Sequence, residues 1–530
     1  MKPTPEQEKV IDLAATGKSF KVEAYAGCGK TSTLVNAAKV MRGKGLYLAF
    51  NRANAMEAKQ KFKGYADAAT IHSLAYQAVG VQFKDRIEGD DAGKLSPYRM
   101  TQVYSYAQLG PITPLGRATL IRQTLDNWMN SADEQPEAVH VPVEQAMLAA
   151  EAAGQVLSRA GMLTEVIVRD TRQLVNDLLS GEKPLAMPLD LCLKLYVMSK
   201  PKLPGDYILF DEAQDGNDLM MQLIRSQDCQ TIYVGDGYQS IYGFRGAVNI
   251  LSKLDDLPTC HLSQSFRFGT TIADKANVVL DCLGATVPLK GFDTDRSELG
   301  SRTALLFRSN TSIFTTLLEK VLKEKQKVAV VGGTKEMGLV LKAVEMLRDG
   351  QETTHPDFVA FRSWREYVDA SEIPGAPADM KRLVKVCTRN PVRALRYALN
   401  ITDRVKEEDA DLVVSTAHKS KGREWPYVQL AEDFYKPEPG EPLEEEEARL
   451  NYVALTRAQI DMVGGEEMLG AFEFRRQEEN AHQVTPQEVD ALIHQLRGMP
   501  TEQRTKYVNG LAPALKQKLM ERASSSKATT

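Results

Sequence analysis

Short apolar runs alternate with stretches of helical spacing along the chain. Residues 21–25 and 207–210 have the length and side chains of short buried strands, and residues 327–333 predict a further strand that ends in a glycine turn. Between the first two strands, alanine and leucine recur at helical spacing in residues 143–153 and 162–168. This pattern predicts an α/β fold with a helical insertion.

The first of these strands leads into a glycine-bearing turn, which we call the phosphate loop (residues 24–31). Backbone N–H groups in such a turn point at phosphate oxygens. Lys30 would bring a positive charge to the β- and γ-phosphates of a nucleotide, and Thr31 would offer its hydroxyl to Mg²⁺. The strict pattern has glycine in place of Ala24, so taken alone the segment could also be a strand–turn–helix with chance glycines. Further predicted nucleotide contacts in and beside this loop are Ala26, Gly27, Cys28, Gly29 and Ser32.

An acidic pair, Asp211 and Glu212, follows the strand at residues 207–210. A carboxylate at the carboxyl end of a strand can reach a metal beside the phosphate loop, so Asp211 is the predicted Mg²⁺ ligand. Glu212 would orient and deprotonate the attacking water. An acidic pair can also lie in a solvated turn, but the apolar strand that precedes Asp211 and Glu212 disfavours this alternative. Gln239 follows closely enough to sense the state of the phosphate, and together these segments indicate an ATP-driven motor.

The acidic pair and the segment around Gln239 resemble parts of a known family. Residues 211–215 and 234–247 resemble motifs II and III of the UvrD/Rep family of superfamily 1 DNA helicases. Seven or more segments occur in this family's order between Pro3 and Gln459. Residues 48–52 and Ser32 are similar to the F-box DNA helicase branch. The other matching segments are residues 49–52 and 69–74 (motifs Ia and Ib), 265–267 (motif IV), 306–310, 415–425 (motif V) and 449–458 (motif VI).

The resemblance implies roles for several residues around a bound ATP. Gln7 would read adenine, because a primary amide can pair with both the donor and the acceptor on the edge of this base. Phe266 would stack on the base, Arg267 would meet the γ-phosphate, and Glu424 would also contact the nucleotide. Ser32 stands where related enzymes often carry an arginine that packs on the adenine, so we expect looser base selectivity.

The resemblance also implies how hydrolysis is coupled to motion. Arg267 and Arg457 would stabilise charge in the transition state, and Arg457 would arrive from a second lobe. Hydrolysis would then require closure of the lobes, which would depend on the γ-phosphate. Gln239 would relay the change to DNA. For each arginine the alternative is a solvated salt bridge. The predicted catalytic residues are Lys30, Glu212, Gln239, Arg267 and Arg457.

The implied partners are single-stranded DNA and junctions between single-stranded and double-stranded DNA. Aromatic side chains would stack on bases while polar groups hold phosphates, which makes the contacts tolerant of sequence. For the aromatic residues core packing is the alternative, and for the histidines it is a structural role. The predicted DNA-binding residues are Phe50, Asn51, His72, Tyr242, Phe244, Arg245 and His418.

The family's architecture has two RecA-like P-loop NTPase lobes with two insertions, which are called 1B and 2B. The predicted 2B-like insertion is much smaller than in the UvrD and Rep enzymes. A helical tail follows motif VI and would either dock a protein partner or pack on the second lobe. The predicted parts are a first lobe at 1–85 and 205–285, a helical 1B-like insertion at 86–204, a second lobe at 286–348 and 406–475, a reduced 2B-like insertion at 349–405, and a C-terminal tail at 476–530.

Composition changes this picture little. The 530 residues carry a net charge of −4, so the overall charge does not indicate binding to nucleic acid. A motor would need only a local basic track along the DNA. Six cysteines are scattered without a CxxC pair, which indicates reduced thiols in a cytoplasmic protein, nucleoid-associated if bacterial. The sequence contains no run of 18 apolar residues, so we expect no membrane span.

The combined prediction is a DNA-stimulated ATPase that moves 3′→5′ on single-stranded DNA and unwinds duplexes, in DNA repair, recombination or replication. Its polarity is implied by the resemblance alone. One alternative keeps the motor but has it strip proteins from DNA with weak unwinding. Another is an ATP-controlled DNA-binding subunit of a larger repair or defence complex.

Overall fold

A computed structural model describes residues 2–87, 95–110, 112–143, 160–243, 246–351, 353, 355, 357–358, 361–372, 377–483 and 496. The chain divides into two compact units. Unit 1 consists of Met1–Ser263 and Thr334–Asn400, and unit 2 consists of Gln264–Gly333 and Ile401–Thr530.

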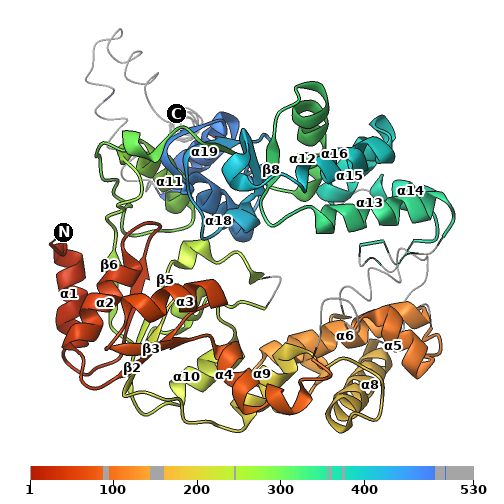
Figure 1. Cartoon of the computed structure of the whole chain (residues 1–530), viewed down its shortest axis with the longest axis horizontal. Helices are drawn as coiled ribbons and strands as arrows, with labels where there is room; N and C mark the ends of the chain where they lie inside the picture. The colour runs from red at the N-terminus through yellow and green to blue at the C-terminus, as the bar shows by residue number, and fades with distance from the viewer. Residues whose placement is uncertain are drawn as a thin grey trace, which may run out of the picture. The chain divides into compact units, whose positions relative to one another are not determined.

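Unit 1 contains a six-stranded parallel sheet in the order β3-β2-β4-β5-β1-β6 (Figure 1). Strand β4 is buried at every position, as expected for a strand of a parallel sheet with both faces covered. Strand β1 lies between β5 and β6, where Val22 pairs with Val234 and Cys260. The strands are β1 (Phe20–Ala24), β2 (Gly45–Leu48), β3 (Ala66–Ala69), β4 (Tyr207–Phe210), β5 (Gln230–Gly235) and β6 (Thr259–Leu262).

The helices of unit 1 mostly begin at residues that cap a helix N-terminus. Thr4, Asn51, Thr70, Ser96 and Thr113 each accept a hydrogen bond from a backbone N–H in the first turn. The helices between residues 1 and 263 are α1 (Pro5–Ala14), α2 (Lys30–Val40), α3 (Arg52–Lys61), α4 (Ile71–Ala78), α5 (Pro97–Tyr104), α6 (Pro114–Asn130), α8 (Ala160–Ser180), α9 (Leu189–Met198) and α10 (Asp218–Arg225).

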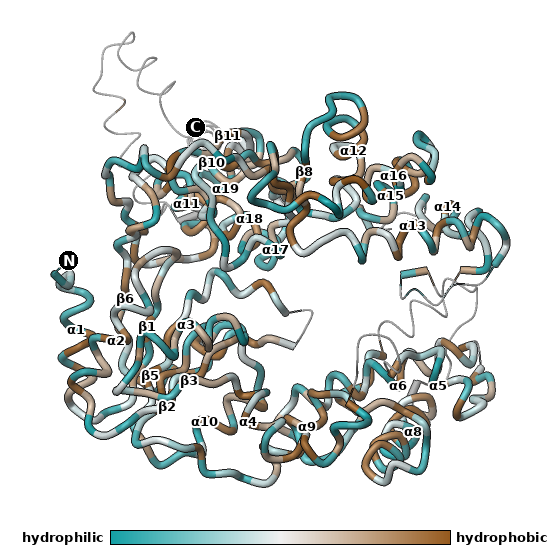
Figure 2. The backbone as a smooth tube through the Cα atoms, in the orientation of Figure 1, coloured by the Kyte–Doolittle hydropathy of each residue, from teal (hydrophilic) through white to brown (hydrophobic). Residues whose placement is uncertain are grey.

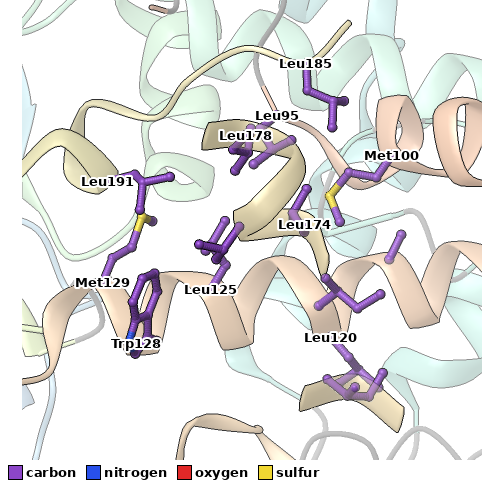
Figure 3. Close-up of a cluster of buried hydrophobic side chains, with 14 of the residues drawn as sticks. Leu95, Met100, Leu120, Leu125, Trp128, Met129, Leu174, Leu178, Leu185 and Leu191 are labelled. Carbon is purple, nitrogen blue, oxygen red and sulfur yellow. The ribbon is translucent and has the colours of Figure 1, made fainter. Parts of the chain in front are cut away.

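The chain between β3 and β4 is the helical insertion. Hydrophobic stretches recur along α6, α8 and α9 (Figure 2), and their side chains meet in a buried cluster that includes Leu125, Trp128, Leu174 and Leu191 (Figure 3). This cluster gives the insertion its own core. The helical spacing at residues 162–168 falls inside α8, whereas most of the predicted helix at 143–153 lies outside the described residues.

A second helical insertion separates β8 from β9. It follows α13 (Lys335–Arg348) and contains, within the described residues, α14 (Trp364–Ser371), α15 (Ala378–Arg389) and α16 (Val392–Thr402). Phe358, Trp364 and Tyr367 stack here, with ring centres 4.8 Å apart for Phe358–Tyr367 and 5.3 Å apart for Trp364–Tyr367. The described part of this insertion is therefore helical, and its limits stay a prediction.

Unit 2 contains a five-stranded parallel sheet in the order β11-β10-β7-β9-β8. Helix α11 packs against α18 and α19. The strands are β7 (Thr303–Phe307), β8 (Val328–Val330), β9 (Leu412–Thr416), β10 (Trp425–Leu430) and β11 (Ala458–Val463). The helices are α11 (Thr270–Cys282), α12 (Asn310–Leu317), a π-helix at Leu318–Lys323, α17 (Ala417–Ser420), α18 (Glu445–Leu455) and α19 (Glu466–Gln483).

The two parallel sheets confirm the predicted fold class of two RecA-like lobes with helical insertions. The compact units follow packing and differ from the predicted lobe limits at two places. Helix α11, assigned from the sequence to the first lobe, packs in unit 2, and residues 334–400 cluster with unit 1. The lobe limits themselves stay predictions. The helices predicted within the C-terminal tail from residue 485 onward lie outside the described residues.

Candidate functional site

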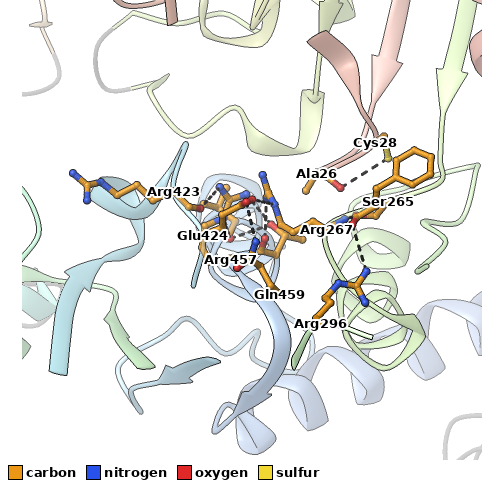
Figure 4. Close-up of polar contacts among 12 residues, drawn as sticks. Ala26, Cys28, Ser265, Arg267, Arg296, Arg423, Glu424, Arg457 and Gln459 are labelled. Atoms are coloured by element: carbon orange, nitrogen blue, oxygen red, sulfur yellow. Dashed lines mark hydrogen bonds and ion pairs between the residues drawn. The ribbon is translucent and has the colours of Figure 1, made fainter. Parts of the chain in front are cut away.

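The phosphate loop lies between β1 and α2 in unit 1. Gly27 and Gly29 both have φ of 74°, a left-handed conformation that glycine adopts without strain. Gly29 is the N-cap residue of α2, and no side chain caps this helix. The N–H groups of the first turn of α2 therefore suit an anion such as phosphate. Ala26 and Cys28 are buried, and the Cys28 thiol lies 3.9 Å from the Ala26 carbonyl oxygen (Figure 4).

The first residue of α2, Lys30, lies against the acidic pair. Its Nζ is 3.1 Å from Oε1 and 3.2 Å from Oε2 of Glu212. Burial alone would lower the pKa of Lys30, but the charges of Glu212, Asp211 and Asp236 outweigh burial and raise it. Lys30 is therefore a positive charge held at the N-terminus of α2, where it can compensate phosphate charge.

Asp211 is buried at the carboxyl end of β4. Burial and the neighbouring charge of Glu212 raise the pKa of Asp211 to about 6. Tyr47 donates its hydroxyl proton to Asp211 Oδ2, and the backbone N–H of Glu212 donates to Oδ1 at 3.0 Å. Burial and the charge of Asp211 raise the pKa of Tyr47 far above its ordinary value, so Tyr47 stays a donor.

These groups fit a bound Mg²⁺ nucleotide. A cation would relieve the repulsion between the buried carboxylate of Asp211 and the adjacent carboxylate of Glu212, which contributes with burial to the raised pKa of Asp211. Asp211 would be a protein ligand, with Thr31 in the first turn of α2. The described residues contain no cluster of three or more His, Cys, Asp or Glu side chains that could hold a metal. Mg²⁺ at phosphate sites commonly has few protein ligands, because phosphates and waters supply the others.

Beyond the acidic pair, a buried glutamine joins motifs II and III. Gln214 donates from Nε2 to Glu212 Oε2 at 2.6 Å, and its Oε1 accepts the backbone N–H of Asp236 at 3.1 Å. Gln239 donates to Asp236 Oδ2 at 2.7 Å. Sequence reasoning singled out Gln239 but missed Gln214 and Asp236. Both residues follow an apolar strand, which is a position typical of site residues in parallel sheets. The sequence pattern does not predict that the two residues contact each other.

The predicted adenine reader lies in helix α1. The side chain of Gln7 completes a capping box, in which its Oε1 accepts the Thr4 N–H at 3.0 Å. The preceding residue, Glu6, accepts the backbone N–H and the hydroxyl of Ser263, both at 2.6 Å. Gln7 thus has a structural role, and the capping contact orients its amide.

Two predicted DNA-binding aromatics form a pair in unit 1. The rings of Phe50 and Tyr242 are stacked, with centres 6.0 Å apart and an interplanar angle of 7°, and Phe50 is 41% exposed. Asn51 caps α3 by accepting the Asn54 N–H at 2.8 Å. Phe244 and Arg245, also predicted to contact DNA, lie outside the described residues.

The predicted DNA-binding residue His72 contacts the helical insertion. Its Nε2 lies 2.9 Å from Asp190 Oδ1, and this hydrogen bond lowers the pKa of Asp190. His418, the other predicted histidine, lies in the short helix α17 of unit 2. His72 therefore has a hydrogen-bond partner that the sequence did not indicate.

In unit 2 the predicted nucleotide residues Arg267, Glu424 and Arg457 come together around the end of α18 (Figure 4). Arg267 Nε donates to Glu424 Oε2 at 2.6 Å, and its Nη1 donates to the Thr456 carbonyl at 3.0 Å. Arg457 is only 1% exposed, and its Nε donates to the Val453 carbonyl at 2.8 Å. A solvated salt bridge is therefore the wrong description of Arg457.

Phe266, the predicted base-stacking residue of unit 2, has an aromatic neighbour. Its ring centre lies 5.7 Å from that of Phe292, at an interplanar angle of 59°. The structure thus brings Lys30 and Glu212 into contact in unit 1, and Arg267 and Glu424 into contact in unit 2.

Two parallel RecA-like sheets and a glycine loop that leads into a helix with Lys30 beside a strand-end acidic pair define a P-loop NTPase. Residues 7–245 match the family model described as an AAA domain, and residues 362–463 match the UvrD-like helicase C-terminal domain. No helix within the described part of the chain is long and apolar enough to cross a bilayer.

Relatives with curated descriptions support the same family. F-box DNA helicase 1 of Gallus gallus is 30% identical over 463 residues, which are 82% of this chain and 45% of the relative. F-box DNA helicase protein 1 of Schizosaccharomyces pombe is 29% identical over 511 residues, 87% of this chain and 57% of the relative. The ATP-dependent DNA helicase PcrA of Leuconostoc citreum is 36% identical over 102 residues, 18% of this chain and 14% of the relative.

The two domain matches and the two long relatives show that the chain is similar to UvrD-like helicases and resembles the F-box DNA helicase branch. The chain spans about half the length of these two F-box helicases.

Proposed function

We propose that this protein is a DNA-stimulated ATPase that translocates 3′→5′ on single-stranded DNA and unwinds duplexes. The observation that carries the proposal is the Lys30–Glu212 contact beside the buried Asp211. It combines a phosphate-binding cation, a metal ligand and a general base in one place. The family match and the names of the helicase relatives support DNA as the track.

The proposed chemistry assigns one task to each of these side chains. The loop N–H groups and Lys30 would bind the β- and γ-phosphates, and Thr31 and Asp211 would hold Mg²⁺. Bound Mg²⁺ would neutralise charge that develops on the phosphates. Glu212 orients the attacking water and accepts its proton. Arg267 and Arg457 supply further positive charge, a contribution worth roughly 10³–10⁵ in rate in related phosphoryl-transfer systems.

The proposed DNA contacts include the exposed ring of Phe50 and its stacked partner Tyr242. Stacking on a base depends little on sequence, because every base has a π-face. We also propose that junctions between single-stranded and double-stranded DNA are substrates. The proposed place of action is the cytoplasm, in association with the nucleoid if the protein is bacterial. We also propose the C-terminal tail as a possible dock for a protein partner.

Strand separation tests this function. Duplexes with either a 3′ or a 5′ single-stranded tail are incubated with ATP, Mg²⁺ and the protein, and Lys30→Met serves as the inactive control. Unwinding of the 3′-tailed duplex alone is the expected result. Unwinding of only the 5′-tailed duplex would reverse the polarity. Displacement of a bound protein without unwinding would instead support a translocase that strips proteins from DNA.

A further inference from the structure

We propose that Gln214 is the positioning residue that fixes the carboxylate of Glu212 for hydrolysis and ties it to the end of β5. This inference rests on the proposed ATPase function. Gln214 is fully buried in the short 3₁₀ helix Ala213–Asp215, directly after the acidic pair. Its side chain therefore has no contact with solvent and is held by its protein partners.

The chemistry of its partners fixes the orientation of the Gln214 amide. The backbone N–H of Asp236 can only donate, so the group 3.1 Å away must be the amide oxygen. The carboxylates of Glu212 and Asp215 accept, and they lie 2.6 Å and 3.5 Å from the amide nitrogen. A flipped amide would place donor against donor and acceptor against acceptor. Gln214 therefore holds Glu212 in one orientation.

The end of β5 leaves room for this amide. A Cβ atom on Gly235 would lie 2.1 Å from Gln214 Oε1 and 3.1 Å from the Ala213 nitrogen. Position 235 therefore requires glycine as long as the Gln214 side chain keeps its contact with the Asp236 N–H. The close approach couples the acidic loop to the strand that carries motif III.

Lys30 and Gln214 contact Glu212 through different chemistry. Lys30 contacts it through a charge, and Gln214 contacts it through a neutral amide. A nucleotide phosphate would compete with Glu212 for Lys30, because both are anions. The amide of Gln214 carries no net charge and would keep its hydrogen bond. Glu212 also has φ of 54°, a left-handed conformation that a residue with a Cβ rarely adopts, so its side chain depends on such external support.

The same glutamine connects the general base to the predicted DNA relay. The backbone N–H of Asp236 donates to Gln214, and the side chain of Asp236 accepts a hydrogen bond from Gln239 Nε2 at 2.7 Å. The Gln214 carbonyl also accepts the Ser240 hydroxyl at 3.1 Å. Displacement of Gln239 or Ser240 would therefore shift Gln214, and through its hydrogen bond would shift the carboxylate of Glu212.

Steady-state kinetics of the full chain with ATP, Mg²⁺ and single-stranded DNA test this role. Gln214→Met keeps the side-chain length but removes the hydrogen bonds of the amide to Glu212, Asp215 and the Asp236 N–H. Gln214→Glu keeps an acceptor for the Asp236 N–H but places a carboxylate against Glu212. We expect kcat to fall on the order of tenfold to a hundredfold for Met, and further for Glu, with KM and the Kd for ATP changed by less than about twofold.

Gln227→Met is the matched control. Gln227 is a half-buried glutamine of unit 1 that also bridges main-chain groups: its amide oxygen accepts the Leu203 N–H at 2.9 Å and its nitrogen donates to the Pro201 carbonyl at 3.1 Å. We expect its loss to lower the Tm without lowering kcat.

The outcomes distinguish the positioning role of Gln214 from the proposed ATPase function. If the wild type hydrolyses ATP and both Gln214 variants keep their kcat, the positioning role is wrong while the proposed function stands. A rise in KM at constant kcat would likewise overturn it. If a Gln214 variant does not fold, the other one decides. A wild type with no ATPase activity would overturn the proposed function and this inference together.

Discussion

The buried ammonium of Lys194 makes a specific prediction about how stability changes with pH. Lys194 lies in α9 and is fully buried. Its Nζ donates to the Ser131 carbonyl at 2.7 Å and lies 4.9 Å from the centre of the Trp128 ring. Burial lowers the pKa of Lys194 to about 8, and the charge of Asp133 only partly opposes this. The cation is thus held in an apolar core at a cost in stability.

The sign of the effect follows from proton binding. Between about pH 8 and the ordinary lysine pKa of 10.5, the unfolded chain binds the proton more tightly than the folded chain. Stability therefore rises with pH across this window, and the cost is fully present below it. The shift corresponds to about 3 kcal/mol at neutral pH, of which about 2 to 3 kcal/mol is relieved near pH 10.

Urea unfolding of the wild type and of Lys194→Met near pH 7 and near pH 10 measures this term. The variant carries no titrating group at this position, so other ionisations cancel in the comparison. We expect the wild type to gain about 2 to 3 kcal/mol relative to the variant at the higher pH. A difference between the two proteins that stays constant with pH would refute the reasoning.

Two further predictions concern the predicted DNA surface and the anchor of α1. Phe50→Ala should weaken single-stranded DNA binding by roughly 1–3 kcal/mol in fluorescence anisotropy and leave the Kd for ATP unchanged, because the ring is exposed and stacked on Tyr242. Met56→Ala, at an exposed position on α3, is its control, and equal effects would contradict the role of Phe50. Ser263→Ala should lower the free energy of unfolding by about 1 kcal/mol, because Glu6 loses a hydroxyl donor. An unchanged urea midpoint would contradict this.

The phosphate loop and the acidic pair were predictable because their chemistry is local. A strand, a glycine turn and a lysine at the start of a helix are adjacent in sequence, and the Asp211–Glu212 pair directly follows an apolar run. Lys30 and Glu212 follow β1 and β4 of one parallel sheet, and the carboxyl ends of parallel strands lie at the same edge of a sheet. The fold class could therefore be inferred together with the centre of the site.

Other contacts depend on side-chain packing that no spacing encodes. Gln214 lies in the same segment as the acidic pair, but its hydrogen bond to the Asp236 N–H depends on a close approach that Gly235 permits. The pairing of His72 with Asp190 joins residues that are 118 positions apart. Arg457 is buried and donates to the backbone carbonyls of Val453 and Arg423, which its charge alone would not indicate.

The central claim is that ATP hydrolysis at Glu212 is coupled to DNA. ATP hydrolysis by the wild type and by Glu212→Gln, each with and without single-stranded DNA, tests it most directly. We expect strong stimulation of the wild type by DNA and loss of hydrolysis in the variant, which keeps the size of the side chain but cannot accept the proton of the water. Hydrolysis that is equally slow with and without DNA, or a variant as active as the wild type, would contradict it.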